Sequence, residues 1–427
     1  MKASHKLADA PVVLAIALAV FLSGATVGLQ DRTSESRTLV LSGAKIYPAP
    51  DVAPIANGVV VVRDQKIAAV GKRGEVSYGR TARILDCTGM VVTAGFQNSH
   101  VHFTEPKWNS AGTQPAARLS AQLTAMFTLY GFTTVVDTGS ILQNTSKLRG
   151  RIESGEVTGP RIIATKASLF PPNGVPIYLR DLLSSWTPDQ PESPDAAVSI
   201  VQRGDGESQD ILKLFTGSLV TYENIKPMPV DTARAAVAEA HRQGRLAFAH
   251  PSNIEGVQIA LAANVDVLAH TTSAPGGWSQ ALVTDVIKRH LALVPTLKLW
   301  KYVTQGAPDP SLGEQMLQSG IAQLRAVSEA GGEILFGTDV GFMGDYDPTD
   351  EYVFMERAGL TSTQILATVT TAPAAKFKEG HRRGRVAVGM DADLVVLGAD
   401  PSENVRNFAD VRYTIHQGKV IYPSPAK

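Results

Sequence analysis

The chain has 427 residues, of which 44% are hydrophobic and 19% are charged, with 40 basic and 40 acidic side chains. This length and ordinary composition predict a globular protein with one large domain and a smaller one. Because the net charge is zero, no basic surface is expected, and nucleic acids and anionic membranes are excluded as partners.

The first 25 residues have the pattern of a signal peptide. Basic residues precede an apolar run over residues 11–22, and small residues follow it. This run is shorter than the roughly 20 residues of a membrane-spanning helix. We therefore expect cleavage after Ala25 and export to the periplasm or the medium, with no stable membrane insertion afterwards. An uncleaved anchor is the alternative, and residues 26–37 predict a solvated linker.

Both ends of the remaining chain predict short strands. Residues 38–89 alternate apolar runs with turns, and residues 381–427 repeat this pattern. Because neither stretch has helical periodicity, we expect them to form one composite β-sandwich. Cys87 is the only cysteine and excludes an internal disulfide. Its strand-and-turn context predicts a small buried hydrophobic side chain with no catalytic role.

Residues 90–380 alternate strand-like runs with helical patterns. The strand candidates are residues 90–98, 133–137, 161–164, 211–215, 246–250, 265–270, 291–295 and 333–339. Eight strands alternating with helices predict an α/β fold of the (β/α)₈ barrel type, a TIM-like barrel. A doubly wound open sheet is the alternative. Its dinucleotide-binding version has little support, because no Gly-x-Gly-x-x-Gly sequence opens a helix after a strand.

One connection is long and irregular. Residues 166–194 carry six prolines and follow the third strand candidate. In a barrel this connection lies on the active-site face, so it is a candidate specificity loop. A packed surface excursion is an equal alternative.

Side chains that bind metals stand at the carboxyl ends of the strand candidates. The set comprises His100, His102, Lys213, His250, His270 and Asp339. In a parallel barrel these ends converge on one mouth, where active sites lie. Imidazole and carboxylate groups are ligands for Zn²⁺. Lys213 lies between apolar residues, and a buried unpaired ammonium is costly, so we expect it to be neutralised, paired or modified.

These residues resemble the amidohydrolase superfamily, specifically its binuclear-metal members near the imidazolonepropionase-like and Xaa-Pro dipeptidase-like enzymes. The closing segment over residues 384–397 is similar as well, and the likeness covers nearly the whole chain after residue 25. Two stretches depart from the family pattern. Residues 94–98 read Ala-Gly-Phe-Gln-Asn instead of Pro-Gly-Phe/Leu-Ile/Asp-Asp, and residues 164–174 lack a Gly-Gly-His stretch. The departures leave the substrate open and the ligand set intact.

The resemblance implies two divalent metal ions, with zinc expected, bridged by a CO₂-derived carbamate on Lys213. It assigns His100 and His102 to the buried metal, and His250 and His270 to the exposed one. Asp339 is implied to bind metal and to shuttle the proton during attack by a metal-bridged hydroxide. Because metal binding needs neutral imidazoles, activity is expected to fall below the pH range of histidine.

Two residues are candidates for binding a small-molecule substrate. Tyr222, after the fourth strand, could hold a carboxylate or the oxyanion, and Lys298, after the seventh, could pair with an acidic group. A surface or packing role is the alternative for each. Asp137 ends the second strand and is expected to be structural, because the ligand set is complete without it.

The leading prediction is a metal-dependent amidohydrolase that cleaves an amide, peptide-like or cyclic C–N bond. A mononuclear deaminase of the same superfamily is the alternative, although such an enzyme does not need Lys213. A non-catalytic barrel is a third reading, but the complete ligand set speaks against it. Homo-oligomer formation through exposed barrel helices stays open.

Overall fold

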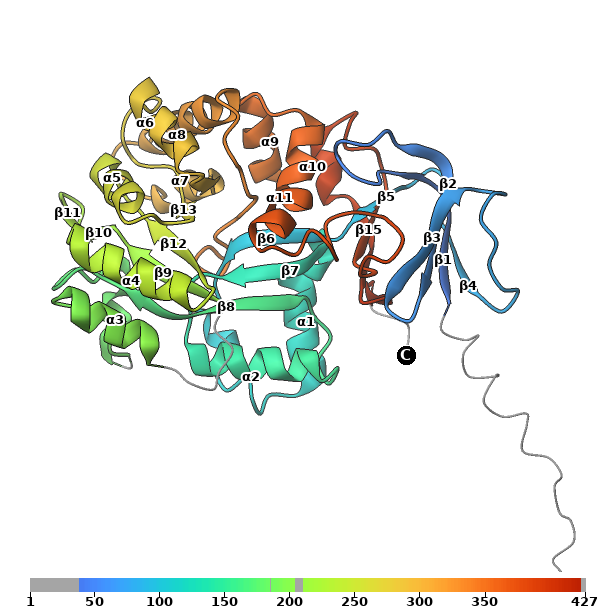
Figure 1. Ribbon diagram of the computed structural model, residues 1–427, viewed down its shortest axis with the longest axis horizontal. Helices are drawn as coiled ribbons and strands as arrows, with labels where there is room; N and C mark the ends of the chain where they lie inside the picture. The colour runs from blue at the N-terminus through green and yellow to red at the C-terminus, as the bar shows by residue number, and fades with distance from the viewer. Residues whose placement is uncertain (1–37, 185, 204–209, 424–427) are drawn as a thin grey trace, which may run out of the picture.

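The structure is a computed structural model that describes residues 38–184, 186–203 and 210–423 (Figure 1). The predicted signal peptide, residues 1–25, and the predicted linker, residues 26–37, lie outside the described residues. Among the described helices, none combines the length and apolar character needed to cross a bilayer.

The two ends of the chain build one eight-stranded sheet (Figure 1). Its strands are β1 (Leu39–Ile46), β2 (Ile55–Arg63), β3 (Lys66–Lys72), β4 (Arg83–Asp86), β5 (Val91–Ala94), β15 (Leu394–Leu397), β16 (Val411–His416) and β17 (Lys419–Tyr422). The order is β17-β16-β15-β5-β1-β2-β3, with β4 beside β1. Antiparallel pairing of β15 with β5 joins the C-terminal part to the N-terminal part, as the sequence predicted.

Alternating side chains of this sheet enter two apolar clusters. Leu41 and Val60 belong to one, whereas Val40 and Val59 belong to the other, because successive residues of a strand face opposite ways. Cys87 is fully buried in the first cluster, which confirms its predicted packing role. Burial raises the pKa of its thiol to about 11.

The second sheet is a parallel barrel. Its strands are β6 (Phe96–Val101), β7 (Phe132–Asp137), β8 (Arg161–Leu169), β9 (Ile211–Phe215), β12 (Leu246–His250), β13 (Val267–Ala269) and β14 (Ala292–Val294). They pair in the order β14-β13-β12-β9-β8-β7-β6. Residues 334–340 close the ring through backbone hydrogen bonds, from Leu335 N to Leu293 O at 2.9 Å and from Ser99 N to Phe336 O at 2.7 Å. The predicted fold class is confirmed.

Three details differ from the sequence prediction. The strand expected over residues 90–98 is two strands, β5 in the terminal sheet and β6 in the barrel, so the boundary expected at residue 90 moves to Gly95. A Cβ at Gly95 would lie 2.3 Å from Thr133 Oγ1, so only glycine fits at this crossing. The eighth strand is irregular, and a hairpin of β10 (Gly217–Thr221) and β11 (Asn224–Pro227) follows β9.

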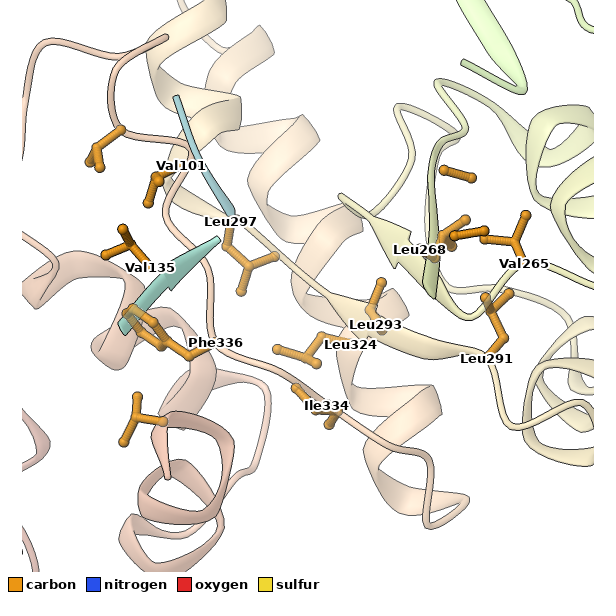
Figure 2. Packing of buried hydrophobic residues seen from close by; sticks show 14 of the residues in the cluster. Val101, Val135, Val265, Leu268, Leu291, Leu293, Leu297, Leu324, Ile334 and Phe336 are labelled. Atoms are coloured by element: carbon orange, nitrogen blue, oxygen red, sulfur yellow. The ribbon is translucent and has the colours of Figure 1, made fainter. Parts of the chain in front are cut away.

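Helices cover the outside of the barrel. They are α1 (Ala116–Met126), α2 (Leu142–Glu153), α3 (Pro194–Gln202), α4 (Val230–Arg242), α5 (Ile254–Ala262), α6 (Gln280–Lys288), α7 (Lys298–Val303), α8 (Leu312–Glu329), α9 (Thr349–Arg357), α10 (Ser362–Val369) and α11 (Thr371–Lys376). Helix α4 buries Ala233, Ala236 and Ala240, at the spacing of one helical face. Figure 2 shows Leu324 of α8 packed beside Leu293 and Ile334 of the barrel wall. This core holds the strand ends in place.

Candidate metal centre

Five of the six predicted ligands lie at or just beyond the carboxyl ends of the barrel strands, and Lys213 lies in the middle of one. His100 is on β6 and His102 follows it, Lys213 is on β9, His250 ends β12, His270 follows β13, and Asp339 is in the closing segment. Their imidazole rings form a continuous series of contacts. Ring centroids are 5.2 Å apart for His100 and His102, 4.6 Å for His100 and His270, and 4.8 Å for His250 and His270.

Asp339 lies against the first two histidines. Its Oδ1 is 3.3 Å from Nε2 of His100 and 3.0 Å from Nε2 of His102. One donor atom from each of these three residues lies within 4.8 Å of the others. Both ring nitrogens of His100 and Oδ1 of Asp339 are buried without a hydrogen-bond partner. Buried polar atoms normally have a partner, so these three residues fit a divalent cation.

The position of His102 is fixed by a loop that Asp137 holds. Nδ1 of His102 is 2.6 Å from the carbonyl oxygen of Gly139. Because a carbonyl only accepts, Nδ1 carries the proton and Nε2 faces Asp339. The buried Asp137 carboxylate accepts hydrogen bonds from Gly139 N, Ser140 Oγ and Thr145 Oγ1. Asp137 therefore supports the loop that orients His102, in line with its expected structural role.

Two side-chain hydroxyls set the tautomers of the next two histidines. Thr296 Oγ1 donates to the Pro295 carbonyl and lies 2.6 Å from Nδ1 of His270. A hydroxyl that has donated its proton can only accept, so Nδ1 of His270 carries a proton and Nε2 keeps a lone pair. The turn that follows is held by the buried Glu351, whose carboxylate accepts from the backbone N–H groups of Leu297 and Lys298.

His250 has the opposite tautomer. Ser252 Oγ donates to the Gly217 carbonyl at 2.9 Å and lies 3.0 Å from Nε2 of His250. Ser252 must accept from this nitrogen, which leaves Nδ1 of His250 with the free lone pair. Each of the two histidines thus has one nitrogen held by the protein and one available to a cation.

Lys213 lies beneath the histidines with 2% of its surface exposed. Burial lowers its pKa to about 7, although the charge of Asp339 acts in the opposite direction. Within the described ranges its ammonium makes no ion pair, and Nζ lies 5.8 Å from the centre of the Phe215 ring. The side chain is therefore held in a form that loses its proton easily.

Burial also keeps most of the imidazoles neutral. It lowers the pKa of His100 and of His250 to about 3, and the pKa of His270 also lies well below 6.5. For His102 burial acts in the same direction, but the adjacent Asp339 carboxylate outweighs it and raises the pKa. Burial likewise favours a raised pKa for Asp339, but His100 and the other imidazoles hold it well below its usual range.

The backbone at this end of the barrel is strained and tightly packed. Four residues that contribute to the site have left-handed φ angles, namely Ser252 (54°), His270 (74°), Thr296 (45°) and Asp339 (63°). Such angles are unfavourable for residues other than glycine and cluster at functional sites. Gly341 also approaches the site, since a Cβ there would lie 1.8 Å from the carbonyl oxygen of His102.

The two predicted substrate contacts lie in different settings. Tyr222 is 86% exposed in the turn between β10 and β11. Lys298 is buried at the start of α7, where Nζ is 2.7 Å from Oδ2 of Asp345 and donates to the carbonyl of Asp347. Lys298 thus has partners within the protein. Binding of substrate by either residue stays a prediction.

Sequence reasoning missed the residues that orient the ligands. Thr296, Ser252 and Glu351 are of types that occur throughout surfaces and turns, so nothing in their spacing distinguishes them. Only the position of Thr296 directly after a barrel strand gave a weak signal, since carboxyl ends of strands point toward the site.

Comparison with known proteins agrees with this arrangement. The sequence profile described as "Amidohydrolase family" matches residues 91–421. Among curated proteins, ochratoxinase of Aspergillus niger is 22% identical over 435 aligned positions, which cover 91% of this chain and 86% of that protein.

Two solved structures have folds similar to that of this chain. A provisionally named prolidase from Bifidobacterium longum has a TM-score of 0.77 and 25% identity, with coverage of 92% of this chain and 96% of that one. A Xaa-Pro dipeptidase with bound methionine has a TM-score of 0.74 and 20% identity, with coverage of 90% and 99%. The likeness extends over the terminal sheet as well as the barrel.

Proposed function

Because the chain belongs to the amidohydrolase family, we propose that it hydrolyses an amide or peptide-like bond of a small organic molecule with two divalent cations at the barrel mouth. The predicted family and its class, a hydrolase of carbon–nitrogen bonds, are confirmed by the family match. The observation that carries the finer proposal is the set of buried donor atoms of His100 and Asp339 that have no hydrogen-bond partner among the described residues.

The donor set favours zinc. Imidazole nitrogens and a carboxylate suit Zn²⁺, which tolerates the low coordination numbers that such sites provide. His100, His102 and Asp339 would hold one cation, and His250 and His270 the other. When bound, the cations would lower the pKa of a water molecule and polarise the scissile carbonyl.

Lys213 is proposed to carry a carbamate that completes the site. Its pKa of about 7 leaves much of the amine neutral at physiological pH. The ammonium first loses one proton, and the neutral amine then forms an N–C bond with CO₂ and releases a second proton, so that a buried cation becomes a carbamate anion. This change removes the cost of burying an unpaired ammonium. A mononuclear aminohydrolase, the alternative, would not need this group.

Asp339 is proposed as the group that moves the proton. Its carboxylate takes a proton as the oxygen of the attacking water bonds to the carbonyl carbon. It then gives the proton to the leaving nitrogen as the C–N bond breaks. Contacts with His100 and His102 hold the carboxylate ionised and in place for the first transfer.

Metal content tests the proposal. We expect two zinc ions per chain by mass spectrometry of the wild type and fewer for Lys213→Ala, with activity restored by added short carboxylic acids. The wild type loaded with ¹³C-labelled CO₂ should give a carbamate signal by NMR. Lys298→Ala is the matched control, since it removes another buried lysine and should leave both ions. One ion per chain, unchanged in Lys213→Ala, would contradict the two-cation site and favour the aminohydrolase.

We also propose that the protein is exported, on the basis of the apolar run over residues 11–22 and the small residues after it. The test is to fractionate cells that express the full chain. Mature protein outside the cytoplasm that begins at residue 26 is expected, and full-length protein in the cytoplasm would contradict export.

A further inference from the structure

The irregular connection between β8 and α3 brings aromatic rings to the metal centre from one side. Phe170 stacks on Phe215 with ring centroids 4.4 Å apart, and Phe215 in turn stacks on His250 at 4.9 Å. Trp186 adds an edge contact to Phe170 at 5.5 Å. This first group of rings therefore ends on one of the proposed metal ligands.

A second group of rings is anchored beside Asp339. Phe342 follows Asp339 by three positions, in a turn closed by a hydrogen bond from Met343 N to the Asp339 carbonyl. The ring of Tyr178, from the same irregular connection, meets the ring of Phe342 at 5.3 Å and 64°. Tyr302 of α7 contacts the other end of this group, 6.1 Å from Phe342.

Tyr178 combines exposure with closeness to the site. It is 38% exposed, yet desolvation together with the charge of Asp339 raises the pKa of its phenol. Its ring lies 5.3 Å from that of Phe342, three positions after Asp339, so it stands beside the segment that carries this carboxylate. Within the described chain its hydroxyl has no hydrogen-bond partner. The ring edge and the hydroxyl are thus both available to a molecule bound at the mouth.

We infer that Tyr178 and Phe342 determine specificity by receiving an aromatic or similarly flat apolar group of the substrate. Rings at these angles present edges and faces that favour a further aromatic partner. Within the described ranges, Lys298 makes an ion pair with Asp345, so this lysine is engaged and not free to recruit a charged group. The inference rests on the proposed hydrolase function and adds to it the class of substrate: an amide that carries a ring next to the scissile bond.

Three small amides test the inference: N-acetylalanine, N-acetylphenylalanine and N-phenylacetylalanine. They share one scissile amide and differ only in whether a ring is present and on which side. For the zinc-loaded wild type, we expect one ring-bearing amide to exceed N-acetylalanine in kcat/KM by about tenfold, mainly through KM. Tyr178→Ala should abolish this preference, so that kcat/KM for the ring-bearing amide falls to the value for N-acetylalanine measured with the same variant. Tyr178→Phe, which keeps the ring, should retain the preference.

Binding measured by calorimetry separates this inference from the hydrolase proposal. If no amide is hydrolysed but a ring-bearing amide still binds the zinc-loaded protein more tightly, and Tyr178→Ala removes the difference, the hydrolase proposal fails and the ring site stands. Equal binding and equal rates for all three amides in the wild type would overturn the inference. A preference that survives in Tyr178→Ala would overturn it as well.

Discussion

Two buried groups of histidine and aspartate side chains in this molecule differ in how their charges are balanced. One is the metal centre. The other, the junction cluster, consists of Arg383, Asp391, Asp393 and His416 at the terminal sheet. There Arg383 Nη2 is 2.8 Å from Asp391, and His416 Nδ1 is 2.8 Å from Asp393. Lys66 and Arg382 also pair with Asp391, so each charge faces an opposite one.

The metal centre lacks such a balance. Its imidazoles lie against other imidazoles, and the Asp339 carboxylate contacts two of them, His100 and His102. The comparison shows that burial of the same residue types can have two outcomes. In the junction cluster the protein supplies partners for the buried groups, and the cluster joins parts of the fold. In the metal centre, lone pairs converge without a partner, and the cluster is suited to bind an external cation.

The largest expected effect comes from the carboxylates of the two groups. Asp339→Asn removes the proposed proton carrier and a metal donor, so kcat should fall by at least about 10³-fold. Asp393→Asn is the matched control in the junction cluster and should leave kcat nearly unchanged, since it lies outside the barrel mouth. Steady-state kinetics at fixed zinc concentration measures both. A similar fall in both variants would mean that the two clusters are not distinct in function.

The stability of the folded protein should depend on the junction cluster. Asp393→Asn removes the carboxylate that is bonded to Nδ1 of His416 and to the backbone N–H of Gln417, and the loss of hydrogen bonds to a buried charged group costs roughly 1.5–3 kcal/mol. Urea denaturation of the variant and the wild type measures the difference in the free energy of unfolding. Arg412→Ala, which removes a more exposed pair with Asp410, should cost at most about 1 kcal/mol. Equal losses would show that burial does not distinguish the two pairs.

Removal of one orienting hydroxyl should weaken the metal centre without breaking it. In Ser252→Ala, Nε2 of His250 loses its acceptor, so the tautomer that presents Nδ1 is no longer favoured. We expect zinc affinity to fall roughly 10–100-fold, measured by competition with a chelator. Ser273→Ala, next to the same turn through its bond to the Ser252 carbonyl, should leave affinity unchanged. An unchanged affinity in Ser252→Ala would indicate that His250 presents the other nitrogen.

The pH dependence of the metal-free protein tests whether the imidazoles are neutral in the fold. The pKa values of His100, His250 and His270 are lowered in the fold, so below about pH 6.5 the unfolded chain binds protons that the folded chain does not. The free energy of unfolding therefore keeps its full value above this pH. It decreases as the pH falls below it, by about 1.4 kcal/mol per pH unit for each group.

His102 contributes in the opposite direction. Its pKa is raised in the fold. Its contribution to stability is therefore complete when the pH is below the pKa of the unfolded chain, and it is lost as the pH rises through the pKa of the folded protein. Urea unfolding of the metal-free wild type between pH 7 and pH 5 measures the slope. His250→Gln should reduce the slope by one proton, and an unchanged slope would contradict the neutral state of His250 in the fold.

The ligands could be predicted because their chemistry and position coincide. Lys213, His250 and His270 each stand in or at the end of an apolar run, which is unusual for polar side chains. Parallel strands bring such ends together whatever the exact strand bounds are. The two groups of strands at the chain ends were recognisable for a similar reason, since short alternating runs without helical periodicity have few other solutions.

Other features depend on contacts between distant parts of the chain. The switch of sheet at Gly95 is hidden in a continuous apolar run, because the steric limit comes from Thr133 on another strand. Lys298 pairs with Asp345 because of the path of the loop that follows residues 334–340, and local sequence does not determine this path. The same holds for Tyr178, which lies in a proline-rich connection without periodicity.

Closure of the barrel by residues 334–340 has a consequence for the order of folding. Asn98 donates to Thr338 Oγ1 at 2.7 Å across 240 positions of the chain, and Asp339 joins His100 at the same seam. Contacts at such separation form slowly, because a long loop must close before they stabilise anything. The first histidines thus emerge early in synthesis but gain their carboxylate partner only after most of the chain has been made. A cation can therefore bind to His100, His102 and Asp339 together only in chains whose barrel is complete.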